Sequence, residues 1–182
     1  SLNEGIEKVR VDSRETFEKT VKFVQKFMPV LSDRVEHYSG ERPIFDLYGV
    51  EDEIQRALRK EVPLKSGGYL IVDQTEAMTT VDVNTGGYLG SRNLEETVYR
   101  TNLEAAQAAA RQLRLRNLGG IIIIDFIDEH KRQVLRMLEK GLQRDHAKTT
   151  VYPMSALGLV EMTRKRTTES LERQLCEPCP AC

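Results

Sequence analysis

Two aspartates and one asparagine have the residue types and the spacing for chemistry on a phosphate. In the stretch AMTTVDVNTGG, Asp82 and Asn84 lie two positions apart in a run of β-branched residues. Side chains at i and i+2 of a strand share a face, so both polar groups are expected to point the same way. Asp125 follows four isoleucines, at the carboxyl end of another predicted strand, which is where open α/β sheets gather their ligands.

The two carboxylates predict a divalent-metal site if their strands are neighbours. Carboxylates brought together repel each other unless they share a proton or a cation. Mg²⁺ removes this repulsion, and it commonly takes one or two carboxylates together with water and phosphate oxygens. Asn84 is neutral and could donate a hydrogen bond to a phosphate. The competing interpretation is that each aspartate caps the loop after its strand. Asp128, three residues beyond Asp125, is read as the N-cap of the next helix.

Cysteines form a second candidate site at the end of the chain. All three lie in the last seven residues, CEPCPAC, and Cys179 and Cys182 have the spacing of metal ligands. Structural zinc takes four ligands, so this pair would need two more from another chain or from further sequence. A tail of free thiols is the alternative. A chain that stops on a candidate ligand is expected to be a fragment of something longer.

Basic residues cluster on the strand that leads to the cysteines. Arg164, Lys165 and Arg166 follow each other, and strand alternation would send the two arginines to one face. Clustered cations suit a phosphate backbone, although a solvated edge strand would carry them too. The arginines of RQLRLR are explained equally well by their place at a helix C-terminus.

Composition is that of a globular protein without a membrane segment. Of 182 residues, 40% are hydrophobic and 30% charged, and the formal net charge is −1. No apolar run approaches the roughly 20 residues that cross a bilayer. The N-terminus lacks the apolar core of a signal peptide, so a reducing, cytoplasmic setting is expected.

The elements that position these residues follow from hydrophobic periodicity. Together they predict an α/β (α+β layered) fold, a mixed sheet with covering helices. The isoleucine strand is expected to be buried on both faces. A loop is expected at 41–49 and a subdomain boundary at 63–68. Helices are expected over 13–29, 50–62, 94–117 and 129–147, with a helical turn at 167–175, and strands within 8–13, 34–40, 68–87 (two), 119–128, 148–154 and 157–166.

Several motifs together resemble one known family. GYLIVDQTEAMTTVDVNTG, NLEETVYRTNLEAAQAAARQLRLRNLGGIIIIDFID, GLVEMTRKR and the closing CPAC are similar to the ribonuclease E/G family, and NTG and IIIIDFID lean toward its ribonuclease G branch. The resemblance implies part of a catalytically inert ribonuclease-H-like subdomain at 1–65. It implies a deoxyribonuclease-I-like catalytic subdomain at 66–175 and a zinc-link at 176–182.

The resemblance also implies roles for single residues. Asp82 and Asp125 match the carboxylates that hold Mg²⁺, and Asn84 matches a phosphate-orienting asparagine. Cys179 and Cys182 match the zinc-link pair, which shares one Zn²⁺ with the same pair of a second protomer. Lys148 falls where the family has a basic residue near its 5′-phosphate sensor, and the role of Cys176 stays open.

The function implied is a Mg²⁺-dependent endoribonuclease that cleaves single-stranded RNA, in rRNA processing and mRNA decay. Attack by water would leave 5′-phosphate and 3′-hydroxyl ends. A homodimer through the zinc-link, possible higher oligomers of the full-length protein, and no membrane partner are expected. Two alternatives stay open: a zinc-linked RNA-binding fragment that does not cut, and a metal phosphoesterase that acts on DNA. In the family, an oligonucleotide-binding barrel and a 5′-sensor precede this region and a small domain follows it, and they are expected to lie outside this stretch. The family pattern also leads us to expect a short deletion after Asp128.

Overall fold

The computed structural model describes residues 6–87, 94–127 and 131–177. These residues form two compact units, Ser1–Glu53 and Ile54–Cys182, each of which is described by itself. Among the described residues, no helix combines the length and the apolar character needed to span a membrane.

The first unit is small and has little core. Its helix α1 starts where the side chain of Ser13 accepts a hydrogen bond from the Thr16 N–H at 3.3 Å. Strands β1 and β2 pair in parallel, with Val9 opposite Val35. A short helix, α2, occupies part of the segment expected to be a loop. The elements are β1 (Val9–Val11), α1 (Arg14–Phe27), the 3₁₀ helix η1 (Pro29–Arg34), β2 (Val35–His37) and α2 (Ile44–Leu47).

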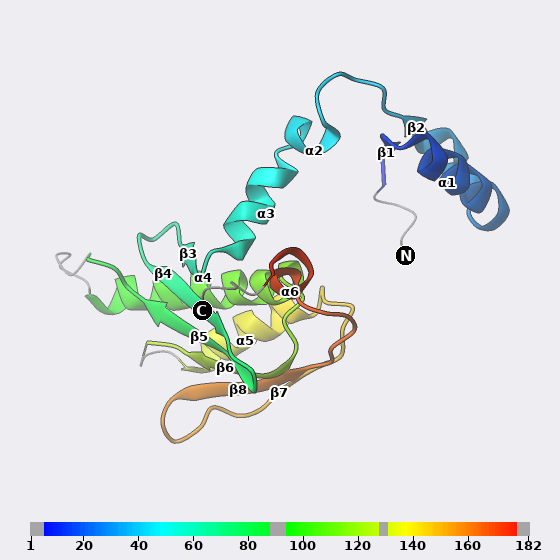
Figure 1. Ribbon diagram of the computed structural model, residues 1–182. Helices are drawn as coiled ribbons and strands as arrows, with labels where there is room; N and C mark the ends of the chain where they lie inside the picture. Colours follow the sequence, from blue (N-terminus) through cyan, green and yellow to red (C-terminus); the bar gives the residue numbers. More distant parts are fainter. Residues whose placement is uncertain (1–5, 88–93, 128–130, 178–182) are drawn as a thin grey trace. The chain divides into compact units, whose positions relative to one another are not determined.

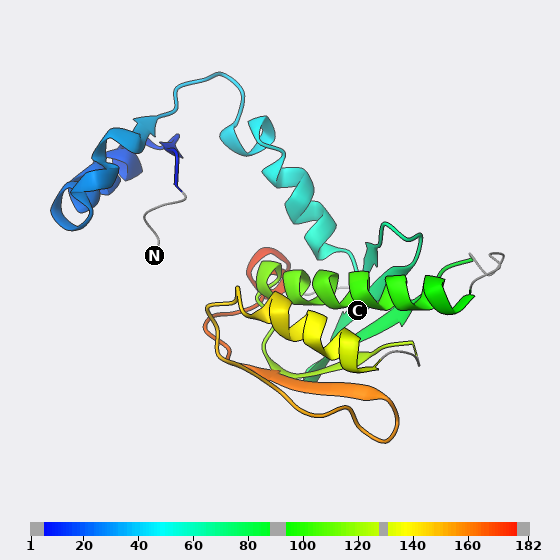
Figure 2. The same ribbon diagram turned by 180° about the vertical axis from the view of Figure 1, so that it is seen from behind.

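The second unit is built on a six-stranded mixed sheet of order β3-β4-β5-β6-β8-β7. Strands β5 and β6 run parallel, and the other neighbours are antiparallel. The views in Figures 1 and 2 show α4 and α5 side by side along the sheet. The elements are α3 (Val50–Leu58), which crosses the division between the units, β3 (Glu61–Pro63), β4 (Tyr69–Gln74), β5 (Met78–Asn84), α4 (Leu94–Leu115), β6 (Gly120–Asp125), α5 (Lys131–Leu142), β7 (Thr149–Val151), β8 (Leu159–Arg164) and α6 (Leu171–Leu175).

The core of the second unit lies between the sheet and its two long helices. Alternate residues of each strand enter it, as the period of two requires. Alanines on one face of α4 let this helix pack closely against the strands and α5. The core includes Leu70, Val72, Val81, Val83, Ala105, Ala106, Ala109, Leu113, Ile122, Ile124, Val134, Leu138, Val160 and Met162. The predicted α/β layered fold with a mixed sheet is therefore confirmed.

Two local predictions were wrong for physical reasons. Residues 61 and 62 were expected to end a helix, but they belong to β3, because pairing with β4 outweighs the helical preference of the sequence. The isoleucine strand β6 was expected to be buried on both faces. Ile122 and Ile124 are fully buried, whereas Ile121 is 51% exposed. In the described chain, the helical layer covers the face that bears Ile122 and Ile124.

Candidate metal centre and its supports

The two aspartates predicted as metal ligands are cross-strand partners. Asp82 on β5 lies in register with Asp125 on β6, where these parallel strands end. Neighbouring strands are about 4.8 Å apart, so the carboxylates start from adjacent backbone positions. Both aspartates are exposed, because the residues next to them along each strand face the core. These neighbours are Val81 and Val83 on β5 and Ile124 on β6. The fold therefore brings together two like charges at one edge of the sheet.

Asn84 completes this group of polar side chains. Its Nδ2 donates a hydrogen bond to Oδ2 of Asp82 at 2.9 Å. This contact confirms that the two side chains share a face of β5. A carboxamide has two N–H donors, so one remains for another acceptor.

The donor set fits Mg²⁺ better than a metal that needs a complete protein cage. Within the described ranges, no group of three or more histidine, cysteine or acidic side chains could hold a metal ion. A pair of carboxylates is nevertheless a common protein contribution to a Mg²⁺ site, since water and substrate phosphate supply the other oxygens. Asp82 and Asp125 would hold the ion.

One turn of α4 supports both strands of this site, and sequence reasoning missed it. The fully buried Asn102 donates from Nδ2 to the carbonyl of Ile127 at 2.7 Å, and its Oδ1 accepts from the Ile127 N–H at 3.1 Å. Ile127 lies two residues beyond Asp125. The available signal was an asparagine at helical spacing on a face that is mostly apolar and rich in alanine.

The same turn holds the segment beside Asn84. Glu104 accepts a hydrogen bond from the Ser66 N–H at 2.9 Å, and the Thr101 hydroxyl donates to Ser66 Oγ at 3.3 Å. The backbone of Gly68 then passes so close that a Cβ there would lie 2.5 Å from the carbonyl oxygen of Asn84. Gly68 is therefore required for the close approach that fixes the end of β5.

The basic cluster divides into one buried and two exposed cations. The side chain of Arg164 is 5% exposed and forms a bidentate ion pair with Asp145, at 2.7 Å and 3.0 Å. Its Nη1 also donates to Asn117 Oδ1 at 3.1 Å and to the carbonyl of Leu118 at 3.0 Å. Arg164 thus joins strands and loops inside the unit, while Lys165 and Arg166 are exposed.

Burial and pairing act in opposite directions on Asp145. Burial by itself would raise the pKa of this carboxyl group. Hydrogen bonds from Arg164 and from the Ala147 N–H, together with the charge of Arg164, outweigh burial and bring the pKa below its ordinary value. The Asp145 carboxyl group is therefore ionised in the folded protein at neutral pH.

The predicted basic residue Lys148 lies beside Lys165. The Lys165 N–H donates to the carbonyl of Lys148 at 2.9 Å, which extends the β7–β8 pairing beyond the strands. Arg166 Nε donates to the carbonyl of Gly119 at 3.2 Å. Both arginine side chains thus reach the segment 117–119, consistent with the predicted alternation.

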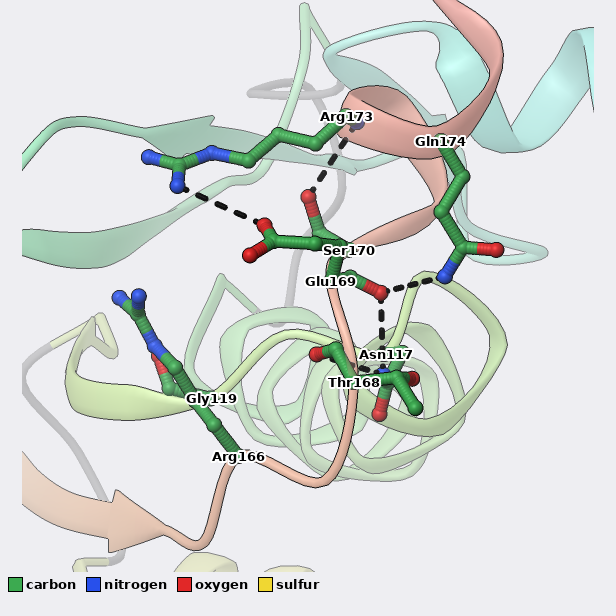
Figure 3. Close-up of polar contacts among 8 residues, drawn as sticks. All are labelled: Asn117, Gly119, Arg166, Thr168, Glu169, Ser170, Arg173 and Gln174. Carbon is green, nitrogen blue, oxygen red and sulfur yellow. Dashed lines mark hydrogen bonds and ion pairs between the residues drawn. The ribbon is translucent and has the colours of Figure 1, made fainter.

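Asn117 fastens the chain that continues toward the cysteines, as Figure 3 shows. It has a left-handed φ of 49°, and its Nδ2 donates to Thr168 Oγ1 at 2.7 Å and to the carbonyls of Thr168 and Glu169 at 3.2 Å. Ser170 then caps α6 by accepting from the Arg173 N–H at 3.5 Å. Cys176 is exposed. The predicted ligands Cys179 and Cys182 and the predicted cap Asp128 lie outside the described residues.

Comparisons with known proteins agree with the resemblance seen in the sequence. The model of the Ribonuclease E/G family matches residues 1–167. The chain is 61% identical to Ribonuclease G of Escherichia coli strain K12, over 97% of this chain and 37% of that protein. Ribonuclease G of Haemophilus influenzae is 58% identical (100% and 38%), and Ribonuclease E of the same organism is 40% identical (100% and 20%). The chain spans less than two fifths of the length of these relatives.

Proposed function

Because the chain belongs to the ribonuclease E/G family, we propose that it carries the cleavage site of an endoribonuclease that acts on single-stranded RNA with Mg²⁺. The observation that carries this proposal is the register pairing of Asp82 with Asp125, with Asn84 hydrogen-bonded to the first carboxylate. Two exposed like charges at the ends of neighbouring strands repel each other, and a bound cation would offset this repulsion.

Each side chain has a separate task in this mechanism. A bound Mg²⁺ would supply Lewis-acid activation of the scissile phosphate and of an attacking water. Asp82 and Asp125 hold the ion, and the second N–H of Asn84 Nδ2 donates to a phosphate oxygen. Because the attacking group is water and not the ribose 2′-hydroxyl, the products carry 5′-phosphate and 3′-hydroxyl ends.

The exposed cations Lys148, Lys165 and Arg166 are proposed to contact the RNA backbone away from the scissile bond. Arg164 pairs with Gly120 at the opposite end of β6 from Asp125. Five residues of strand separate these ends by about 16 Å. The basic residues therefore act on affinity, and Arg164 acts by positioning its two exposed neighbours.

The remaining parts of the proposal follow the family. Residues 1–65 belong to a ribonuclease-H-like subdomain, 66–175 to a deoxyribonuclease-I-like subdomain and 176–182 to a zinc-link. Cys179 and Cys182 share one Zn²⁺ with the same pair of a second protomer in a cytoplasmic homodimer, with higher oligomers of the full-length protein. Zinc near half an equivalent per chain at dimer mass supports this link, and a zinc-free monomer contradicts it.

Matched RNA and DNA oligonucleotides, each incubated with and without Mg²⁺, test the cleavage proposal. We expect Mg²⁺-dependent cutting of single-stranded RNA with 5′-phosphate products. Asp82→Asn and Asp125→Asn should each lower the rate of Mg²⁺-dependent cleavage by more than about 100-fold. That factor is the upper range for residues that only support metal ligands. Glu161→Gln, an exposed acid on the same sheet face, is the matched control and should stay near wild type. Binding without cutting favours the scaffold alternative, and equal cutting of DNA favours the phosphoesterase.

A further inference from the structure

We propose that Asn102 is a positioning residue for the metal centre: its carboxamide holds the backbone beyond Asp125 so that both aspartates can bind one ion. This inference rests on the proposed Mg²⁺ site. Its basis is a two-point contact, in which Asn102 both accepts from the Ile127 N–H and donates to the Ile127 carbonyl. Two bonds to one residue fix the orientation of that backbone as well as its position.

The contact between Asn102 and Ile127 lies just beyond the last paired residue of strand β6. Asp125 is the last residue of β6 in register with both neighbouring strands, opposite Asp82 on one side and Leu159 on the other. Phe126 and Ile127 follow outside the ladder. Ile127 is only partly exposed, so its backbone N–H and C=O groups are expected to find partners outside the ladder. Asn102 supplies them from a different element.

The surroundings of Asn102 argue against a purely structural purpose. It is 0% exposed, on a helix face that also carries Ala105, Ala106 and Leu113. A buried carboxamide is costly unless its hydrogen bonds are made, and an apolar core can be equally stable. The Asn102 side chain reaches the segment that follows the candidate ligand Asp125. This contact is better explained by a need to hold Asp125 in a defined position.

The turn that contains Asn102 also reaches the other side of the site. Thr101 and Glu104 hold Ser66, and Gly68 then packs on the backbone of Asn84. The segment after Asp125 and the segment beside Asn84 are therefore held by the same turn of a 22-residue helix. Rigid support of this kind is what keeps ligands within binding geometry.

Direct binding of Mn²⁺, used as a paramagnetic substitute for Mg²⁺, provides the test. We expect Asn102→Ala to weaken Mn²⁺ binding by about 10- to 100-fold, the usual effect of removing a group that orients a metal ligand. Leu113→Ala is the control: it removes a fully buried side chain from the same helix. It should lower the stability toward urea without changing Mn²⁺ affinity. Asn102→Asp keeps the acceptor for the Ile127 N–H and should bind Mn²⁺ less tightly than wild type.

The outcomes separate this inference from the proposed function. Unchanged Mn²⁺ affinity in a folded Asn102→Ala protein, with binding abolished by Asp125→Asn, overturns the inference and leaves the metal site standing. Failure of the wild type to bind Mn²⁺, or binding that survives Asp125→Asn, overturns both. If Asn102→Ala does not fold, Asn102→Asp decides by the same comparison with Leu113→Ala.

Discussion

The two ends of strand β6 carry charge clusters that were both predicted to be functional, and they differ completely in their surroundings. At the carboxyl end, Asp82 and Asp125 are exposed like charges with Asn84 beside them. At the other end, Arg164 is buried against an opposite charge and two further acceptors. Exposed like charges side by side mark the candidate site, and a buried charge paired with its opposite marks the scaffold.

The energetic logic of the two clusters is opposite. Removing one member of a buried ion pair leaves an uncompensated charge, which is strongly destabilising. Removing one of two exposed carboxylates relieves repulsion and leaves folding nearly unaffected. The comparison therefore predicts stability effects at one end of β6 and chemical effects at the other.

The substitution Asp145→Ala gives the strongest test of this difference between the two ends of β6. We expect it to lower the free energy of unfolding by about 3–5 kcal/mol, because Arg164 stays buried without its partner. Asp82→Ala, the matched change at the other end, should alter the free energy of unfolding by less than about 0.5 kcal/mol. Urea denaturation of both variants measures the difference. Equal losses would mean that the acid pair is as structural as the arginine pair.

Asn117→Ala should have the next largest effect on stability. The substitution removes the donor to Thr168 and Glu169 and places alanine at a φ of 49°, for an expected loss of about 2 kcal/mol. Asn117→Gly removes the same hydrogen bonds but tolerates the backbone, so its loss of stability should be smaller. Thermal unfolding and limited proteolysis between residues 165 and 176 report both. Equal losses would remove the role assigned to the left-handed backbone.

The stability that the ion pair between Arg164 and Asp145 contributes should depend on pH. The pKa of Asp145 is lowered in the folded state, so its contribution to stability is complete above the unfolded pKa of about 4 and is lost as pH falls through the lower folded value. The stability difference between wild type and Asp145→Asn should therefore shrink below pH 4. Urea midpoints from pH 7 to pH 3 provide the measurement. A constant difference across this range would contradict the pairing.

The smallest effects are expected from the exposed cations. Lys165→Ala and Arg166→Ala should each weaken RNA binding a few-fold and lower the salt dependence of log K by about 0.7 for each phosphate that is no longer neutralised. The maximal cleavage rate should not change, because these residues lie at the far end of β6. Lys140→Ala, on the exposed face of α5, is the control. A reduced maximal rate would place the basic cluster in the chemistry.

Local pattern predicted which side chains share a face, and tertiary contacts decided the rest. Alternation placed Asp82 beside Asn84, and the hydrogen bond between them confirms it. The register of Asp82 with Asp125 depends on how β5 and β6 pair, which no local pattern contains. Likewise, alternation indicated the face of Arg164 but not its burial, since its partner Asp145 comes from the segment after α5.

Asn102 shows a different limit of sequence reasoning. Its position on the inner face of α4 follows from the helical period, and a polar residue there was visible. What it binds was not, because Ile127 belongs to a segment 25 positions away whose backbone leaves the sheet. For the same reason β3 was missed: its pairing with β4 outweighed the helical pattern that precedes it.

The parallel pairing of β5 with β6 also has a kinetic consequence. Hairpin β4–β5 closes over a few residues, but Asp82 and Asp125 are 43 positions apart, with the whole of α4 between them. Loop-closure entropy makes such distant pairings slow relative to local ones. The two carboxylates therefore become neighbours late, after α4 has packed on the sheet. A nascent or partly folded chain therefore lacks the paired acids, and under the proposed function its metal site forms only when the core is complete.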